Sequence, residues 1–235
     1  MATASAPMAS LASMPHETKL DPASRDALRA KLVARIPRWY SPWVHLACPS
    51  VVGLGLIAAA VLLLREVRWW DLLVVPLTFV ASNATEWRTH RYVLHRRSRL
   101  LELLYDRHTP EHHRVFVTED MAMRSTREFR LVLIPAYGIL VTFLVTLPVA
   151  ALAWWAGLHN GAALYVATSM GYVVSYEWLH LAYHLPPEST VGRLWLVRVL
   201  RRHHATHHDP ALMQRWNFNV TIPLWDWVRG TTWKG

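Results

Sequence analysis

The sequence is poor in cysteine and begins without an apolar segment. Cys48 is the only cysteine, so no disulfide can form within the chain and nothing indicates an oxidising compartment. Residues 1–14 (MATASAPMASLASM) lack the apolar core of a cleavable signal peptide. We therefore predict that residues 1–42 form a disordered tail followed by an amphipathic helix, and that residues 43–235 form one membrane-embedded domain.

Charged residues are absent from two long stretches, although the chain is 53% hydrophobic and rich in tryptophan. Residues 43–64 contain none, and a helix of this length rises about 33 Å, enough to cross a hydrocarbon core of about 30 Å. Residues 131–176 contain none either, and the turn-forming segment GLHNG at 157–161 divides them into a hairpin. The apolar run 72–85 is short for a span and alone favours a buried or interfacial helix, but two adjacent tryptophans precede it as typical interface anchors. The sequence thus predicts an all-α integral membrane protein with four transmembrane helices in two hairpins and a cytoplasmic histidine-rich cap.

Basic residues are nearly missing from one side of the expected membrane. Of the 25 lysines and arginines, only Arg65 and Arg68 lie between the first two spans, and none lies between the other two. By the positive-inside rule, both termini and the long middle segment face the cytoplasm. A nucleic-acid-binding protein would gather its basic residues on a folded polar domain, and no segment here has that character.

Two amphipathic stretches fit the same arrangement. Residues 21–39 combine Asp21 as N-cap and Pro22 at the first helical position with apolar Leu28, Leu32, Val33 and Ile36, while the basic residues lie elsewhere. Residues 191–202 have a similar pattern. We predict helices that lie in the membrane interface; the alternative is that they are solvent-facing helices packed on a soluble domain.

Histidine is concentrated in four short segments on the expected cytoplasmic side. The order of features repeats: a hairpin, Glu-Trp, a spaced pair of histidines and then Arg-His-x-x-x-His-His, first at 86–113 and again at 177–208. Many protonated histidines close together would repel one another, so such a cluster is sustained mainly where metal ions occupy the lone pairs. Outside the four segments we expect ordinary roles for His16, His45 and His159. The segments are THRYVLH (89–95), RHTPEHH (107–113), HLAYH (180–184) and RHHATHH (202–208).

The spacings within the segments indicate two metal ions. His180 and His184 share one face of a helix, whereas His90 and His95 lie about 140° apart unless the helix ends or loosens between them. The adjacent pairs at 112–113 and 207–208 diverge by about 100°, which suits each pair to reaching two different ions. A tetrahedral zinc needs four ligands and a single octahedral ion six, so one site would leave several histidines unused.

Acidic residues near these segments are candidates to orient the rings. A carboxylate that accepts the second ring N–H fixes the tautomer of a metal-binding histidine. We predict this role for the carboxylates named below; the alternative is that they pair with the many arginines. They are Glu86, Glu111, Glu177 and Asp209.

Imidazole ligands bind several metals and do not identify the ion by themselves. The position of the cluster at the membrane indicates which class of reaction the ions carry out. Ions held at the ends of apolar helices are placed to receive an alkyl chain rising from the bilayer. Chemistry on an unactivated C–H bond needs a redox metal, because a Lewis acid polarises a carbonyl but does not abstract hydrogen from a methylene. We therefore expect two iron ions, with zinc as a possible occupant after purification.

The four histidine segments, together with NFNVTIPLWDWVRGT at 217–231, resemble the fatty acid hydroxylase superfamily, the sterol desaturase and sphingolipid hydroxylase group of membrane di-metal oxygenases. The resemblance covers about residues 69–232. The second segment departs from it, with three residues between His108 and His112 where many members have two. The internal repeat favours His203 as the first ligand of the last segment, the family pattern favours His204, and we follow the family. The ligands that the resemblance implies are His90, His95, His108, His112, His113, His180, His184, His204, His207 and His208.

What the resemblance implies is a di-iron oxygenase that uses dioxygen and two electrons to hydroxylate a lipid C–H bond. The alternatives are a lipid desaturase of the same fold and a non-catalytic membrane zinc-binding protein. Because the residues before the first span are too few for a fused haem domain, we expect a separate ferredoxin- or cytochrome-type donor with its reductase. Near the site, Tyr183 is a candidate for the substrate pocket, while turn roles are favoured for Asn217, Asn219, Asp226, Gly230 and Thr231.

Overall fold

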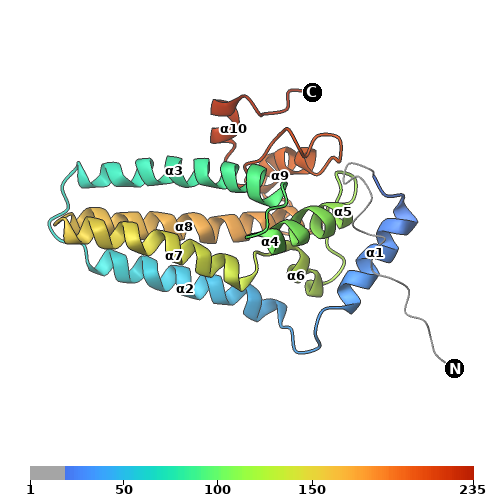
Figure 1. The fold of residues 1–235 in the computed structure, drawn as a ribbon, viewed down its shortest axis with the longest axis horizontal. Helices are drawn as coiled ribbons and strands as arrows, with labels where there is room; N and C mark the ends of the chain where they lie inside the picture. Colours follow the sequence, from blue (N-terminus) through green and yellow to red (C-terminus); the bar gives the residue numbers. More distant parts are fainter. Residues whose placement is uncertain (1–18) are drawn as a thin grey trace.

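Four long helices lie side by side and carry shorter helices at one end (Figure 1). The computed structural model describes residues 19–235, apart from the side chains of 136–140 and 143. The predicted tail at 1–14 and His16 therefore lie outside the described residues. No strand occurs among residues 19–235, so the predicted all-α class is confirmed for this part of the chain. The long helices are α2 (Pro42–Leu62), α3 (Val74–Thr89), α7 (Ala136–Trp155) and α8 (His159–Tyr183).

The long helices form two antiparallel hairpins whose connections both lie at the same end (Figure 1). α8 is central and packs against α2, α3 and α7. Gly53 permits a close approach of α2 to α8, since a Cβ atom at this position would lie 2.5 Å from Cγ2 of Val174. At the tips, the Asn160 side chain accepts from the Arg65 N–H at 3.0 Å and donates to the Arg65 carbonyl at 2.8 Å and to Asp71 at 2.9 Å. The two hairpin ends are thereby tied together.

The third long helix, α7, begins at Ala136, although the stretch without charged residues begins at residue 131. Residues 131–134 do not enter α7: α6 (Phe129–Val132) belongs to the short helices, and Leu133 is extended. Pro135 follows, and a proline disfavours the helical conformation of the residue before it. α7 therefore starts at Ala136, and the backbone of residues 131–134 is left available for other hydrogen bonds.

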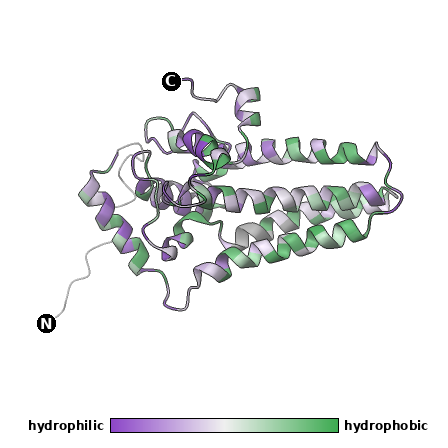
Figure 2. Cartoon of the chain, turned by 180° about the vertical axis from the view of Figure 1, so that it is seen from behind, coloured by the Kyte–Doolittle hydropathy of each residue, from purple (hydrophilic) through white to green (hydrophobic). Residues whose placement is uncertain are grey.

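Among the residues whose side chains the structure describes, α2 is long and apolar enough to cross a membrane. The segment Leu144–Trp155, the part of α7 beyond its undescribed side chains, is also apolar. Figure 2 shows that apolar residues are most frequent in the long helices. Polar residues are most frequent at the end of the molecule that carries the short helices.

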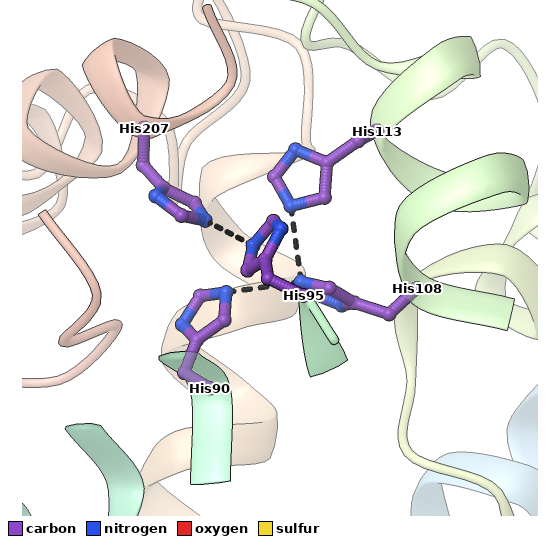
Figure 3. Close-up of side chains that lie close together, drawn as sticks. All are labelled: His90, His95, His108, His113 and His207. Carbon is purple, nitrogen blue, oxygen red and sulfur yellow. Dashed lines mark hydrogen bonds between the residues drawn. The ribbon is translucent and has the colours of Figure 1, made fainter. Parts of the chain in front are cut away.

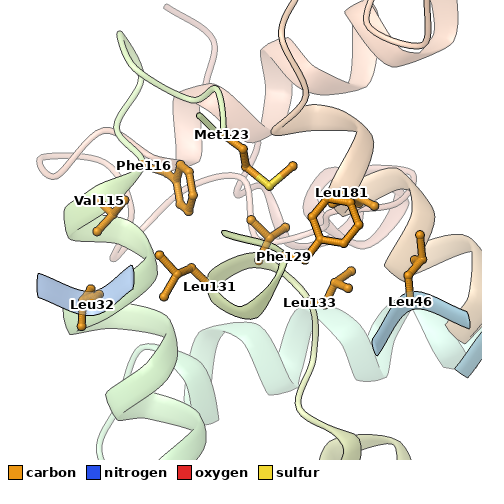
Figure 4. Packing of buried hydrophobic residues seen from close by; sticks show 10 residues of the cluster. Leu32, Leu46, Val115, Phe116, Met123, Phe129, Leu131, Leu133 and Leu181 are labelled. Atoms are coloured by element: carbon orange, nitrogen blue, oxygen red, sulfur yellow. The ribbon is translucent and has the colours of Figure 1, made fainter. Parts of the chain in front are cut away.

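The short helices form what we call the cap, at the end of the bundle away from the hairpin connections (Figure 1). A buried apolar cluster joins the cap to the bundle, with Phe116, Phe129 and Leu131 of the cap packed with Leu46 of α2 and Leu181 of α8 (Figure 4). The cap comprises α1 (Pro22–Ala34), α4 (Glu102–Arg107), α5 (His113–Val115), α6, α9 (Trp195–His207), α10 (Leu224–Arg229), the 3₁₀ turn η5 (Thr126–Glu128) and two π-helices, η3 (His90–Leu94) and η4 (His108–His112); a further 3₁₀ turn, η2 (Asp71–Leu73), precedes α3.

In α1, two of the basic residues face the protein interior, which the amphipathic pattern does not predict. Asp21 caps the helix as expected, accepting from Ser24 N–H at 3.0 Å. However, Arg25 and Arg29 are buried, and Leu32 packs into the cap cluster. The reason is electrostatic, because the cap offers buried acceptors that compensate the guanidinium of Arg29 for its lost hydration.

Arg29 ties α1 to the rest of the cap. It donates to Glu128 at 3.0 Å and to the carbonyls of Ala122 at 3.1 Å and Val115 at 3.3 Å. Replacing Arg29 by Leu leaves the buried Glu128 without its cation, so we expect R29L to lower the free energy of unfolding by about 3 kcal/mol in detergent. The double variant R29L/E128L should recover most of this loss, and equal instability of the two variants would contradict the pairing.

Candidate metal centre

The structure gathers all ten of the histidines predicted as ligands into two groups of five. In each group every residue offers one nitrogen, and these nitrogens lie within 4.8 Å of one another. The groups adjoin, since the stacked rings of His113 and His208 have centroids 4.2 Å apart. Site A (Figure 3) comprises His90, His95, His108, His113 and His207; site B comprises His112, His180, His184, His204 and His208.

Each site takes four histidines from one half of the chain and one from the other. Site A is built from the 90–113 half, but its fifth member is His207. Site B is built from the 180–208 half, but its fifth member is His112. The adjacent pairs His112-His113 and His207-His208 therefore each divide between the sites, as the divergence of neighbouring side chains on a helix predicts.

The four histidines that the first half gives to site A are brought onto common faces by π-helical turns. The His95 N–H donates to the His90 carbonyl, and the His113 N–H donates to the His108 carbonyl. A hydrogen bond from residue i+5 to i widens the turn, so residues five apart share a face, which they would not do in an α-helix. Pro110 lies inside the second turn, where its missing N–H and its ring disfavour regular α-helix. The extra residue between His108 and His112 is accommodated in this way.

The matching histidines of the second half use ordinary α-helical spacing. His180 and His184 belong to α8 and its C-cap, and His204 and His208 to α9 and its C-cap. His204 is fully buried in site B, whereas His203 points away and its Nε2 lies 3.0 Å from Oδ2 of Asp226. The internal repeat is therefore misleading at this position, because a four-residue spacing replaces the five-residue spacing of the first half.

Variants of His203 and His204 should show which of the two is a metal ligand. H204A should lower the ion content by about one per chain, since a buried ligand position is lost. H203A should leave the ion content unchanged and cost about 1–2 kcal/mol of stability through the lost contact with Asp226. Metal analysis of the two purified variants beside the wild type measures this, and an ion lost only in H203A would contradict the geometry.

Backbone carbonyls, not carboxylates, orient five of the ten rings. Five Nδ1 atoms face carbonyl oxygens, which only accept hydrogen bonds, so each Nδ1 carries the proton and Nε2 presents its lone pair to the site. The predicted orienting role of the four carboxylates is wrong for Glu86 and Glu177, whose partners lie elsewhere and include no arginine. The pairs are His90 with Phe218, His112 with Leu131 (2.9 Å), His184 with Met121 (2.8 Å), His207 with Trp216 (2.8 Å) and His208 with Phe116 (2.6 Å).

Burial makes these histidines neutral. For those outside the long helices, burial lowers the pKa well below its usual value and neighbouring histidines lower it further; the pKa of His90 falls to about 3. A neutral imidazole is the form that binds a metal ion. The electrostatics of the cap therefore keep the cluster in its ligating form.

The donor atoms fit metal ions in both sites. In site B, Nε2 of His112, His180 and His184 is buried and has no hydrogen-bond partner. In site A, Nε2 of His90 lies 2.9 Å from Nε2 of His108, and Nε2 of His95 lies 2.9 Å from Nε2 of His207. Two ligands at right angles around an ion with bonds of about 2.1 Å lie about 3.0 Å apart. Nε2 of His90 and of His207 presents a lone pair, because Nδ1 of each carries the proton, and its spacing to the neighbouring ring matches that of two ligands on one ion.

The C-terminal segment closes the centre. Asp226 is fully buried and accepts from the backbone N–H of Phe218 at 3.0 Å and of Asn219 at 2.8 Å, and from the Thr231 hydroxyl at 2.6 Å. Burial alone would raise the pKa of Asp226, but these hydrogen bonds and the contact with His203 lower it. Gly230 ends α10 in the left-handed conformation, with φ of +63°. The turn role expected for this segment is confirmed.

Other residues of this segment also serve structure. Asn217 donates to the His203 carbonyl at 3.0 Å and adopts a left-handed φ of +58°. Asn219 donates to the Asn83 carbonyl at 3.0 Å, and Tyr183, expected near substrate, donates to the Val220 carbonyl at 2.9 Å. These contacts tie the segment to α3, α8 and α9.

Two kinds of residue at the centre could not be assigned, or were not assigned, from the sequence. Asn83 is fully buried, donates to the Ile222 carbonyl at 2.8 Å and accepts from the Trp225 N–H at 2.8 Å. A lone asparagine in the apolar run 72–85 was a usable signal for it. The carbonyl partners of the histidines had no such signal, because any residue type offers a carbonyl.

The fatty acid hydroxylase family model matches residues 75–231 of the chain. The chain belongs to the fatty acid hydroxylase family. The matched range begins in α3 and contains all ten histidines, so the resemblance seen in the sequence is confirmed. Searches of curated proteins and of solved structures found no significant match. Membership of the fatty acid hydroxylase family implies an oxidoreductase, and the two histidine groups fit metal binding.

Proposed function

We propose that the protein is a membrane-bound di-iron oxygenase that hydroxylates a C–H bond of a lipid, using dioxygen and two electrons. The observation that carries this proposal is the pair of adjoining five-histidine sites in a chain of the fatty acid hydroxylase family. The substrate is a molecule with a long alkyl chain, of fatty acyl, sphingolipid or sterol type. The ten histidines of sites A and B are the proposed ligands.

A bilayer around the long helices accounts for their surface. Apolar side chains are exposed along α2 and along the described part of α7, among them Val51 and Leu54 of α2 and Leu144 and Leu152 of α7. Such a surface is stable in lipid and would be a large exposed patch in water. We infer that all four long helices cross the membrane, including α3, which η2 and the flanking tryptophans extend.

Tryptophans mark two levels along the bundle. Trp43 is exposed at the cap end of α2, and Trp178 at the cap end of α8. Trp69, Trp70 and Trp155 are exposed at the hairpin connections, the last with 87% of its surface accessible. The 21 residues of α2 between the two levels rise about 32 Å, close to the thickness of a hydrocarbon core. Aromatic belts at this separation are typical of a membrane-spanning bundle.

The distribution of basic residues sets the orientation. The hairpin connections carry two arginines, and the cap and the segments around it carry the rest. We propose that the cap, with both sites, faces the cytoplasm. On α9, Trp195, Leu196 and Val199 are exposed while Val197 and Leu200 are buried, which supports its predicted position in the interface.

The residues of the centre have defined tasks in this reaction. Bound iron supplies the redox chemistry that removal of hydrogen from an unactivated carbon requires. The carbonyl-oriented imidazoles would hold the two ions, and the burial of these rings excludes bulk water from the reacting atoms. We expect the two electrons to come from a separate ferredoxin- or cytochrome-type donor with its reductase.

Metal analysis and product analysis test the proposal together. Protein purified anaerobically in detergent should contain about two irons per chain. With a reducing system and a lipid extract, mass spectrometry should find a product with one added oxygen, and none with H184A. Loss of two hydrogens instead would identify a desaturase. One zinc or no metal, with no product from any lipid, would overturn the oxygenase in favour of a non-catalytic zinc-binding protein.

A further inference from the structure

Glu86 joins α3 to the C-terminal segment. Its Oε1 accepts from the backbone N–H of Val220 and from that of Thr221 at 3.1 Å. Its Oε2 accepts from the Thr221 hydroxyl at 2.6 Å and from the hydroxyl of Tyr172 in α8. The carboxylate therefore has four donors, and it lies one helical turn before His90 of site A.

The segment that Glu86 holds supplies the carbonyls that orient site A. The Trp216 carbonyl accepts from Nδ1 of His207 at 2.8 Å, and the Phe218 carbonyl accepts from Nδ1 of His90. These two histidines come from different halves of the chain. The segment therefore fixes how the His90 and His207 rings are oriented relative to each other. Holding Val220 in place holds the two carbonyls that precede it.

Glu177 likewise holds a segment whose carbonyl orients a histidine of site B. It lies in α8, one turn before His180, and its Oε1 accepts from the backbone N–H of Ile134 at 3.2 Å. Ile134 follows Leu131, whose carbonyl accepts from Nδ1 of His112 at 2.9 Å. His112 is the member of site B that crosses over from the first half of the chain.

The two glutamates are equivalent positions of the repeat, each within a Glu-Trp pair at the start of its half. They differ in their hydrogen bonds: Glu86 is fully satisfied, whereas Oε2 of Glu177 is buried and has no partner. The segment of site B therefore depends on a single hydrogen bond to its glutamate.

We propose that Glu86 and Glu177 are repeat-related positioning residues, each holding the carbonyl-bearing segment of one metal site: Glu86 for site A and Glu177 for site B. The inference rests on the proposed two-ion centre. Each glutamate acts through backbone carbonyls that fix histidine tautomers across the two halves of the chain. Among the described residues, no histidine is a hydrogen-bond partner of either carboxylate.

Titration of metal-stripped protein with ferrous iron, without oxygen, tests the assignment of each glutamate to its site. We expect E86A to weaken iron binding at site A and E177A at site B, each by about 10–100-fold, the usual effect of losing an outer ligand-orienting contact. Backgrounds with one site removed make the sites separable. In H184A, where site A remains, E86A should weaken binding and E177A should not; in H95A, where site B remains, the reverse should hold.

Conservative variants separate positioning from loss of the fold. E86Q keeps the oxygen that accepts from the two backbone N–H groups, and its amide can donate to the two hydroxyls, which can turn to accept. E86Q should therefore bind iron as the wild type does, and E102A, which removes an exposed carboxylate of α4, serves as the matched control. Circular dichroism and thermal unfolding in detergent identify any variant that fails to fold.

The outcomes distinguish the two proposals. If the wild type binds fewer than two irons, the two-ion centre fails before the glutamates are tested. If the wild type binds two and H95A and H184A bind one each, the centre stands. In that case, unchanged affinity in folded E86A and E177A, or equal weakening of both sites by each, would overturn the positioning roles. Loss of binding in E86Q equal to that in E86A would show that the charge, and not the accepting oxygen, is what matters.

Discussion

H112A is expected to lose one iron per chain and at least about 100-fold in activity, and the lost ion is that of site B. His112 belongs to the same sequence segment as His108 and His113, yet its ring lies with those of His180 and His184. Its Nε2 is buried without a hydrogen-bond partner, so its lone pair is available to an ion. Removal of a direct ligand should lower activity by more than the 10–100-fold decrease that follows removal of an outer contact. H207A should have the matching effect on site A.

Double variants measure which histidines share an ion. H112A/H184A removes two members of site B and should retain about one iron, whereas H112A/H95A removes one member from each site and should retain almost none. If each ion were held by only one half of the chain, the two results would be exchanged. Iron content of anaerobically purified protein decides between the arrangements, and H45A, which alters a histidine outside both sites, is the control.

D226A is expected to lower the free energy of unfolding by about 5 kcal/mol, the upper end for removal of a buried charged partner. Four donors lose their acceptor: two backbone N–H groups, the Thr231 hydroxyl and the His203 ring. Because Phe218 also accepts from His90, the loss should reach site A and weaken its iron binding by about 10–100-fold.

Chemical unfolding in detergent and iron titration measure the two effects of D226A. The matched control is D209A, which removes a half-buried carboxylate that accepts from the Ala211 N–H at 2.8 Å in its own turn. It should cost about 1 kcal/mol and leave iron binding unchanged. Equal destabilisation by the two variants, or full iron affinity in D226A, would contradict the role of Asp226 in closing the centre.

Helix spacing explains why the cluster was predictable. The divergence of adjacent histidines on a helix implies two ions, and His180 and His184 share a face because they are four apart. For His90 and His95 the same geometry required a loosened helix, and the structure has a π-helix there. Such inferences hold because side-chain direction along a helix depends on local spacing alone.

Local spacing was insufficient where the chain folds back on itself. Asp21 and Pro22 marked the start of α1, but the amphipathic pattern did not reveal that Arg25 and Arg29 face inward. Their acidic partners lie about a hundred residues away, and no local pattern connects the two segments. Similarly, His203 occupies the repeated sequence position, while tertiary packing directs it to Asp226.

Residue types and their spacing alone thus indicate the all-α class, the two hairpins and the four segments that carry the clustered histidines, while the choice of His204 over His203 came from the family resemblance. The tertiary structure decides which five histidines share a site, because the crossing of His112 and His207 depends on how two distant halves pack. It also decides what orients the rings. For five of the ten rings the partner is a backbone carbonyl, which every residue carries, so only its position in space distinguishes it.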